Sequence, residues 1–442
     1  MPFWLNAGLV GLFALLVGRM AKDNVCALMP IASIALVLAW QGVSIAYLES
    51  GVYSPELMLT SHPTGGTARY VGAIVSFLGV YWIVFRTMLS RRWLARYGCP
   101  PARMEQAARL ALPIILLTLA ATVVLLGYAP REAIDSRSKF LVENPVLVRD
   151  RLLEYQPYLA LILGFATGIT RRAGIRVLGY ATLLLMLLVL YLYGNKFSGI
   201  TETFFLFAMP FVALLKMYPI DRRVGGLTTA RQGLLVTAAL LIAVTEGQIR
   251  EIGYLQSTGG EGGYLLERVF ILQGGIWWIT DDQAVNGVYQ PGLREFAQFV
   301  RGEDYFQDSS LMYLMTRAIG YDLTYKIFMF DDSLFTGTFP AIYYAIGGRS
   351  GPVLFSALTG LIVALAAGYA TRKILRGQAL LALLACGIFL PLDNLASAAE
   401  FTPLLSLGLL AKFGLVLLIE SMTLMRSFPR LSLLGDPVAE TV

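Results

Sequence analysis

The chain alternates between long apolar runs and short polar segments from one end to the other. Because a helix needs about 20 residues to cross the hydrocarbon core of a bilayer, each long run is a candidate membrane span. The expected spans are residues 2–17, 26–47, 70–85, 110–128, 155–170, 177–193, 200–215, 233–244, 352–370, 379–395 and 403–425. The pattern predicts an all-α, polytopic membrane protein with about eleven transmembrane helices.

Lysine and arginine gather in alternate loops, most densely in residues 86–109. Positive residues mark the cytoplasmic side, so we expect a multi-pass protein with an extracytoplasmic amino terminus, which in a bacterium means periplasmic, and a cytoplasmic carboxyl terminus. We expect the first turn at Arg19 and Lys22, and another near Asp393 after the tenth span. The first run lacks a basic leader and a small-residue cleavage site, so it is expected to stay as a span.

Composition supports this class and excludes others. Of the residues, 57% are hydrophobic and 14% charged, whereas soluble domains carry about 25% charged residues. The net charge of +6 follows from basic cytoplasmic loops and does not indicate nucleic-acid binding. Cys26, Cys99 and Cys386 share no metal-ligand spacing, and the single histidine, His62, excludes a His-rich metal site.

Residues 246–340 form the one long segment that is too polar for a bilayer. We expect a large periplasmic loop between the helices of residues 1–245 and those of residues 341–442, all in one integrated domain. The segment Thr336–Arg349, with small residues and a proline, predicts a broken or re-entrant helix that lines a cavity as the chain returns.

Three cations at the expected periplasmic face are candidates for an anion site: Lys196, Arg250 and Arg268. Lys196 is flanked by glycines that permit a close approach of ligand, although a snorkelling lysine would look the same. Each arginine has an acidic neighbour in the sequence and is equally typical of a surface ion pair. Together they favour binding of a lipid-linked phosphate.

Acidic pairs and the histidine are the candidate catalytic groups. Asp281-Asp282 and Asp331-Asp332 have the residue type that binds a divalent metal beside a phosphate, but Asp-Asp also forms turns and helix caps. A single carboxylate, Asp331 or Asp332, would serve as general base towards a sugar hydroxyl. His62 is the alternative base, or a solvated loop residue.

Aromatic and polar residues of the long loop complete the candidate site. Trp277 and Trp278 are typical of interface anchors and equally of platforms on which sugars stack. We assign them to substrate binding together with Arg317 and Thr338. Lys412, inside the last expected span, is predicted to pair with a neighbouring helix rather than to carry out chemistry.

Over residues 193–376 this layout resembles the Wzy-type polymerases of lipid-linked repeat units. Gly194-Asn195-Lys196 ends a mid-chain helix where that family often has Gly-x-Arg, a further helix leads to Arg250, and Arg268 follows 18 residues on. The chain then returns from a long periplasmic loop through a Thr-x-Pro segment before a Gly-Gly.

The resemblance implies a GT-C-like helical fold and metal-independent, inverting glycosyl transfer without a cofactor. The growing glycan would leave undecaprenyl pyrophosphate, held by Lys196, Arg250 and Arg268, as a hydroxyl of the next repeat unit attacks. Lysine in place of arginine gives a point charge instead of a bidentate fork. The base would be Asp331, Asp332 or His62, in that order. A Wzz-like chain-length co-polymerase is the implied protein partner.

Three other functions fit parts of the sequence. An O-antigen ligase shares the layout but relies on a histidine in the large loop, and residues 246–340 contain none. A transporter or flippase of lipid-linked sugars would place polar residues through the midplane of several helices, whereas this chain gathers its charges at one face. A membrane scaffold without chemistry is the third.

Overall fold

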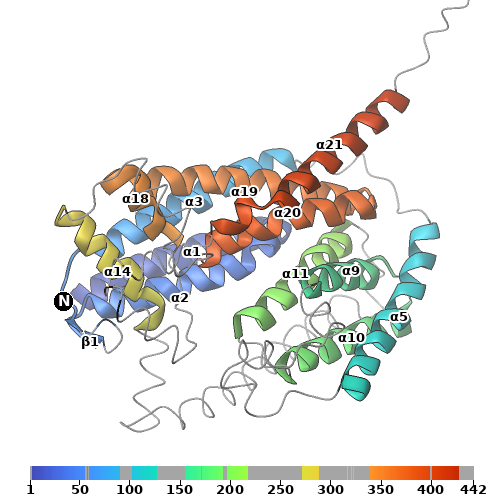
Figure 1. The fold of residues 1–442 in the computed structure, drawn as a ribbon, viewed down its shortest axis with the longest axis horizontal. Coiled ribbons are helices and arrows are strands. Elements are labelled where there is room, and N and C mark those ends of the chain that lie inside the picture. Colours follow the sequence, from blue (N-terminus) through green and yellow to red (C-terminus); the bar gives the residue numbers. More distant parts are fainter. Residues whose placement is uncertain are drawn as a thin grey trace, which may run out of the picture.

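The computed structural model describes residues 2–54, 57, 59–89, 102–126, 155–170, 172–192, 197–217, 271–287, 316, 320, 322, 339–398 and 401–427. Figure 1 shows that this part of the chain is a bundle of long helices with one short hairpin at its edge. The expected all-α architecture is therefore confirmed for the described residues.

The helices and strands have the following bounds. The α-helices are α1 (Pro2–Leu28), α2 (Ala32–Leu48), α3 (Gly66–Met88), α5 (Ala102–Leu126), α9 (Gln156–Ile169), α10 (Ala173–Leu192), α11 (Phe197–Met217), α14 (Leu272–Val285), α18 (Tyr343–Gly347), α19 (Gly351–Leu375), α20 (Ala379–Ala398) and α21 (Leu407–Ser427). The 3-10 turns are η1 (Met29–Ile31), η3 (Phe339–Ile342), η4 (Gly348–Ser350) and η5 (Thr402–Leu405). Strands β1 (Tyr53–Ser54) and β2 (Leu59–Thr60) pair antiparallel.

Five helical segments are long and apolar enough, by length and composition, to cross a membrane. They are Trp4–Asp23, Cys26–Leu48, Gly66–Met88, Phe339–Leu375 and Ala379–Ser397, and four shorter apolar helices accompany them. The expected span at 233–244 lies outside the described residues. A membrane protein agrees with these helices, and the count of eleven spans stays a prediction.

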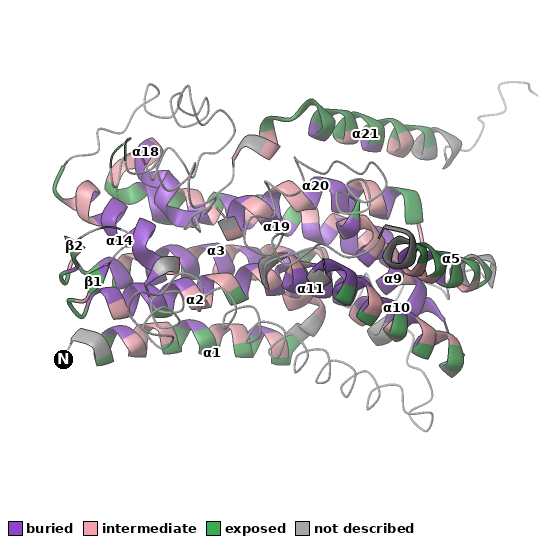
Figure 2. Cartoon of the chain, turned by 60° about the horizontal axis from the view of Figure 1, so that its bottom comes forward, coloured by how far each residue is buried: buried purple, intermediate pink, exposed green. Residues whose placement is uncertain are grey.

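Figure 2 shows that the outer helices α1, α5 and α21 carry many exposed residues, and large apolar ones are among them. They include Trp4, Leu12 and Leu15 of α1, Leu110, Ile114 and Leu117 of α5, and Leu407, Leu410 and Leu417 of α21. Single exposed apolar side chains are normal on soluble proteins, but here they recur along the length of three helices. Lipid is the solvent that such a surface fits.

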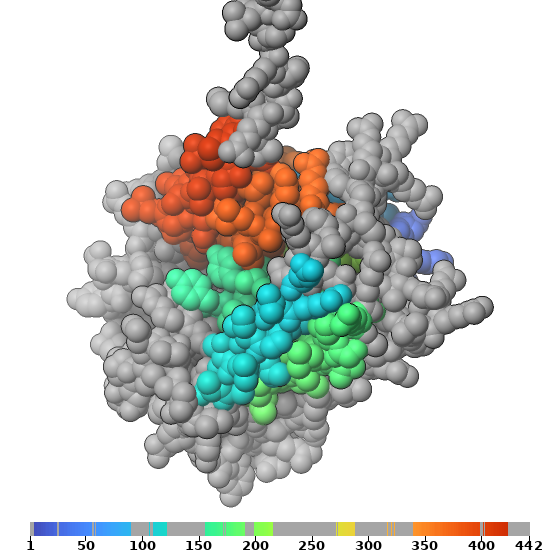
Figure 3. Space-filling view, turned by 90° about the vertical axis from the view of Figure 1, so that its right-hand side faces the viewer, coloured from blue at the N-terminus to red at the C-terminus, as the bar shows by residue number. Residues whose placement is uncertain are grey.

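The bundle contains two closely packed groups of helices, one built around α3 and α19 and the other around α9 and α11. In each group a glycine lets two helix backbones come into close contact. In the first group α3 packs on α19, where a Cβ at Gly360 would lie 2.3 Å from the carbonyl oxygen of Phe77. In the second, α9 packs on α11, where a Cβ at Gly164 would lie 2.1 Å from the carbonyl oxygen of Phe207. Small residues at helix crossings are typical of membrane bundles. Seen from the end in Figure 3, α5 lies across the second group, with the carboxyl-terminal helices beside it.

Two expected turns are wrong. Helix α1 continues through Arg19 and Lys22, whose side chains are exposed, and the chain turns at η1, where Pro30 cannot supply a backbone hydrogen bond to a continuing helix. Asp393 is not at a turn but buried within α20, where it accepts a 3.1 Å hydrogen bond from Ser33 of α2.

The return from the long loop is a broken helix, as expected. Turns η3, α18 and η4 follow one another before α19, and the break falls at Gly348, whose φ is 56°. Only glycine adopts that conformation readily. The residues from Phe339 to Ala345 are all buried against the bundle and form part of its core. The expectation that this segment lines a cavity stays a prediction.

Candidate functional site

Two segments that were expected on the same side of the membrane meet at one end of the bundle. They are the β1–β2 hairpin with its flanking loop, and helix α14 from the long loop (Figure 1). Ser44 of α2 fixes α14 by accepting from the backbone N–H of Gly274 at 2.8 Å and donating to the carbonyl of Ile271 at 2.9 Å. A Cβ at Gly274 would lie 2.6 Å from the backbone nitrogen of Ile45, so only glycine permits this contact.

The two tryptophans of α14 are packing residues. Trp277 is 0% exposed and donates to the carbonyl of Gly66 at 3.2 Å, and Trp278 is 1% exposed and donates to the carbonyl of His62 at 3.1 Å. A ring stacks on a sugar only if one face is accessible. The assignment of Trp277 and Trp278 to substrate binding is therefore wrong, because protein covers both indoles and their N–H groups hold the loop of residues 62–66.

Glu49 binds the amino-terminal end of α3. Its carboxylate accepts from the backbone N–H of Gly66 at 2.6 Å and of Thr67 at 3.2 Å, from both the N–H and hydroxyl of Thr64, from the hydroxyl of Thr67, and from the amide of Asn6. Burial by itself raises the pKa of this carboxyl, but the hydrogen bonds from Thr67, Thr64 and Gly66 outweigh it and lower the pKa of Glu49 below its usual value. A carboxylate is the natural partner of free N–H groups at a helix amino terminus.

Asp281 forms the buried half of an ion pair between α14 and α3. Arg69 donates to it through both Nε (2.7 Å) and Nη2 (2.5 Å), in the bidentate geometry that suits guanidinium and carboxylate. The Asp281 side chain is 0% exposed and that of Arg69 is 36% exposed. Tyr344 of α18 donates its hydroxyl to the same carboxylate. The Thr64 hydroxyl lies 3.3 Å from Asp281 and 3.0 Å from Glu49, and it shares its single proton between the two carboxylates. Asp281 thus joins three segments that are distant in sequence.

Asp282, the next residue, faces His62. The His62 Nε2 and Asp282 Oδ1 atoms are 3.2 Å apart, and the same oxygen accepts from the amide of Asn286 at 3.1 Å. The histidine ring meets the edge of Trp278 with centroids 5.2 Å apart. His62 is 56% exposed and Asp282 is 24% exposed, so the pair is open to solvent while its orientation is fixed. An imidazole held by a carboxylate is a common arrangement for proton transfer.

The structure tests only some of the candidate residues. His62, Trp277 and Trp278 are described and lie together. The other candidates lie outside the described residues: Lys196, Arg250, Arg268, Arg317, Asp331, Asp332 and Thr338. Asp281 and Asp282 lie within α14 rather than at a turn or amino-terminal cap. Among the described residues, no group of three metal-ligating side chains is found.

Sequence reasoning missed Arg69, Glu49 and Tyr344. A signal for Arg69 was present, since an arginine in the first turn of an apolar span needs a partner at that membrane face.

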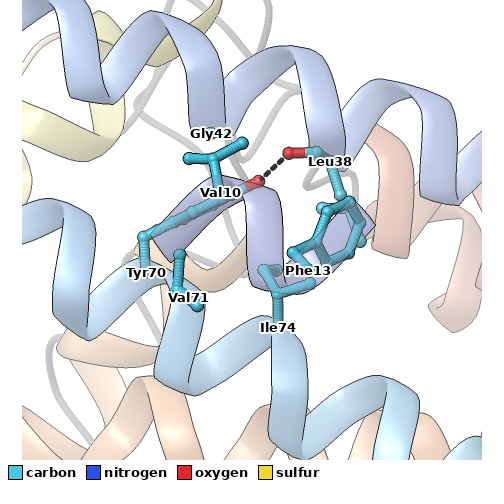
Figure 4. Close-up of a pocket in the computed structure, with 7 residues that line it drawn as sticks. All are labelled: Val10, Phe13, Leu38, Gly42, Tyr70, Val71 and Ile74. Atoms are coloured by element: carbon cyan, nitrogen blue, oxygen red, sulfur yellow. Dashed lines mark hydrogen bonds between the residues drawn. The ribbon is translucent and has the colours of Figure 1, made fainter. Parts of the chain in front are cut away.

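The described part of the bundle also holds a small apolar pocket between α1, α2 and α3, about 10 Å³ in volume and lined by Val10, Phe13, Leu38, Gly42, Tyr70, Val71 and Ile74 (Figure 4). It is too small and too apolar to receive a sugar.

A comparison with protein families matches part of the chain. A family of unknown function (DUF6418) matches residues 304–412, which run from the long loop through α19 and α20 into α21. No curated protein matches the chain, and no solved structure matches it.

Proposed function

We propose that this protein is a glycosyltransferase of the bacterial inner membrane that polymerises undecaprenyl-pyrophosphate-linked repeat units into O-antigen or exopolysaccharide. The observation that carries the proposal is the His62–Asp282 pair. It places a solvent-accessible base, oriented by a carboxylate, at the polar end of an otherwise apolar helical bundle. Lipid-linked substrates present their sugars at such an end.

In the proposed reaction, His62 takes the proton of the attacking hydroxyl. When Nε2 carries a proton and donates it to Asp282, Nδ1 is left as an acceptor for the sugar hydroxyl. The hydroxyl oxygen then forms a bond to the anomeric carbon, the bond from that carbon to the pyrophosphate oxygen breaks, and pyrophosphate leaves with the electron pair. The proton ends on Nδ1, and Asp282 stabilises the resulting imidazolium.

The remaining parts of the proposal rest on the sequence. Lys196, Arg250 and Arg268 would hold the departing pyrophosphate. The eleven spans follow from the apolar runs, and the GT-C-like fold and a Wzz-like co-polymerase follow from the family resemblance. Of the candidate bases Asp331, Asp332 and His62, we favour His62, because the Asp282 carboxylate lies 3.2 Å from its Nε2 and orients the ring.

An O-antigen ligase is the second candidate, and one contact favours it. The long loop contains no histidine, yet His62 lies against Asp282 and Trp278 of that loop's helix α14. The absence of a histidine from residues 246–340 therefore does not separate polymerase from ligase.

Reconstitution with defined acceptors separates the candidates. The purified protein is incubated with undecaprenyl-pyrophosphate-linked repeat units, with and without lipid A core and with and without chelator, and the products are resolved on a gel. A ladder that forms without lipid A core and survives chelator supports the polymerase. Transfer that requires lipid A core supports the ligase, and substrate that changes leaflet without lengthening contradicts both.

A further inference from the structure

Helix α21 carries charge on its inner face and leucine on its outer face. Leu407, Leu410 and Leu417 are exposed, whereas Lys412 and Glu420 are partly buried and reach other helices. The expectation that Lys412 pairs with a neighbouring helix is confirmed, since it contacts α9 and α20. This arrangement suits a helix whose outer face lies in lipid.

At one end of α21 the charges are balanced. Glu420 forms an ion pair with Lys373 of α19, and it also accepts a hydrogen bond of 2.7 Å from the hydroxyl of Tyr369. A cation and an anion in apolar surroundings stabilise each other when both are paired. This junction is therefore complete without a ligand.

Within the part of the chain that the structure describes, Lys412 has no such counter-charge. Its ammonium donates to the hydroxyl of Tyr158 at 2.9 Å and to the carbonyl of Gly387 at 3.4 Å, and both acceptors are neutral. Across the described residues, no carboxylate lies within ion-pairing distance of Lys412. An ammonium has three N–H donors, and the Tyr158 hydroxyl, which accepts from it, still has its own proton to donate. The described residues of the site therefore offer two further donors and a positive charge but no anion.

Gly387 shapes this junction. A Cβ there would lie 2.7 Å from the Tyr158 hydroxyl and 3.2 Å from Lys412 Cδ, so a larger residue would push the two side chains apart. The ammonium also lies 5.6 Å from the centroid of the Tyr158 ring. A partly buried cation whose hydrogen-bond acceptors are all neutral is costly in apolar surroundings. A close-fitting arrangement that keeps such a cation therefore points to a ligand that completes it.

We propose that Lys412 and Tyr158, at the junction of α9, α20 and α21, bind the phosphate group of an anionic lipid. The phosphate oxygens accept from both donors and supply the missing charge, and the acyl or prenyl chain lies along the exposed leucines of α21. The site does not depend on the proposed glycosyl transfer. A phospholipid and a polyprenyl phosphate present the same anion, so the experiment has to separate them.

The test measures lipid binding to the purified full chain in neutral detergent by native mass spectrometry, with phosphatidylglycerol, undecaprenyl phosphate or phosphatidylcholine added. The intact protein is expected to bind at least one anionic lipid more tightly than phosphatidylcholine. Lys412→Gln and Gly387→Ala should weaken that binding about tenfold, and Lys412→Arg should retain it. The stronger of the two anionic lipids identifies the source of the phosphate.

Lys373→Gln is the matched control, because it removes a lysine that already has a carboxylate partner. Its lipid affinity should equal that of the unaltered protein, and each variant's thermal unfolding shows whether it has folded. The proposal would be overturned if folded Lys412→Gln bound each anionic lipid as tightly as the unaltered protein does. If inorganic phosphate at the same concentration fully displaced the lipid, the bound phosphate group would not come from a lipid.

Discussion

Asp281 and Asp282 are neighbours on one helix, yet they belong to regions of opposite character. Asp281 is 0% exposed and lies in a network with Arg69, Tyr344 and Thr64 that ties α3, α14 and α18 together. Asp282 is 24% exposed and holds one half-exposed histidine. Successive residues of a helix point about 100° apart, so one carboxylate faces the bundle and the other faces the rim. The inner region gives stability and the outer region carries the proposed chemistry.

The largest expected effect on stability comes from the inner region. Asp281→Asn leaves the guanidinium of Arg69 without its charged partner, and removal of one member of a buried ion pair costs about 3 kcal/mol. We expect a clear fall in the thermal unfolding midpoint of the purified protein. Asp282→Asn is the matched control and should shift the midpoint little. Equal shifts in the two variants would contradict the contrast between the regions.

The next largest effect on stability is expected where α14 packs against α2. Gly274→Ala places a methyl group 2.6 Å from the backbone nitrogen of Ile45, and overpacking of this kind costs about 1–3 kcal/mol. Gly275→Ala, one residue on, meets its nearest neighbour at 3.5 Å and should be close to neutral. Denaturation of the two variants side by side measures the difference. A greater loss of stability in Gly275→Ala than in Gly274→Ala would contradict the close packing of α14 on α2 described above.

Glu49 is expected to make a pH-dependent contribution to the free energy of unfolding. The pKa of Glu49 in the folded protein is lower than its ordinary value of 4.5, so the unfolded chain binds the proton more readily. The stabilisation is fully present above about pH 4.5 and is lost as the pH falls through the lower pKa of the folded state. Glu49→Gln should lower stability near pH 7 by about 1.5–3 kcal/mol and should flatten this part of the pH profile. A Glu49→Gln profile parallel to that of the unaltered protein would exclude this role.

The smallest effect on stability is expected at the rim. His62 is 56% exposed and makes one polar side-chain contact, with Asp282, so His62→Ala should change the free energy of unfolding by less than about 0.5 kcal/mol. Thermal unfolding beside Asp281→Asn measures this directly. A loss as large as that of Asp281→Asn would make His62 a structural residue.

Much of the helical layout could be predicted from apolar length, because a span needs a run of apolar residues whatever its tertiary partners. The expected runs at 70–85, 352–370 and 379–395 lie within α3, α19 and α20. The sequence does not predict the turn at η1, because the charged residues Arg19 and Lys22 indicate a loop before it. In the structure both lie within the continuous helix α1, and their side chains are exposed.

The candidate site was harder to predict, because its contacts are non-local. His62 and Asp282 are 220 positions apart, and nothing in either segment names the other. The Trp277-Trp278 pair suggested an exposed platform, but the neighbouring Gly274 lets α14 approach α2 so closely that both rings become buried. A glycine that permits close approach has a meaning only when the opposing backbone is known.

One measurement tests the central claim most directly: the rate of glycan elongation by reconstituted His62→Ala, with its unfolding midpoint recorded on the same sample. If His62 is the base, elongation falls by about 10²–10⁴-fold while the midpoint stays that of the unaltered protein. Elongation at the normal rate by folded His62→Ala would contradict the account and would move the base to the expected carboxylates, Asp331 or Asp332.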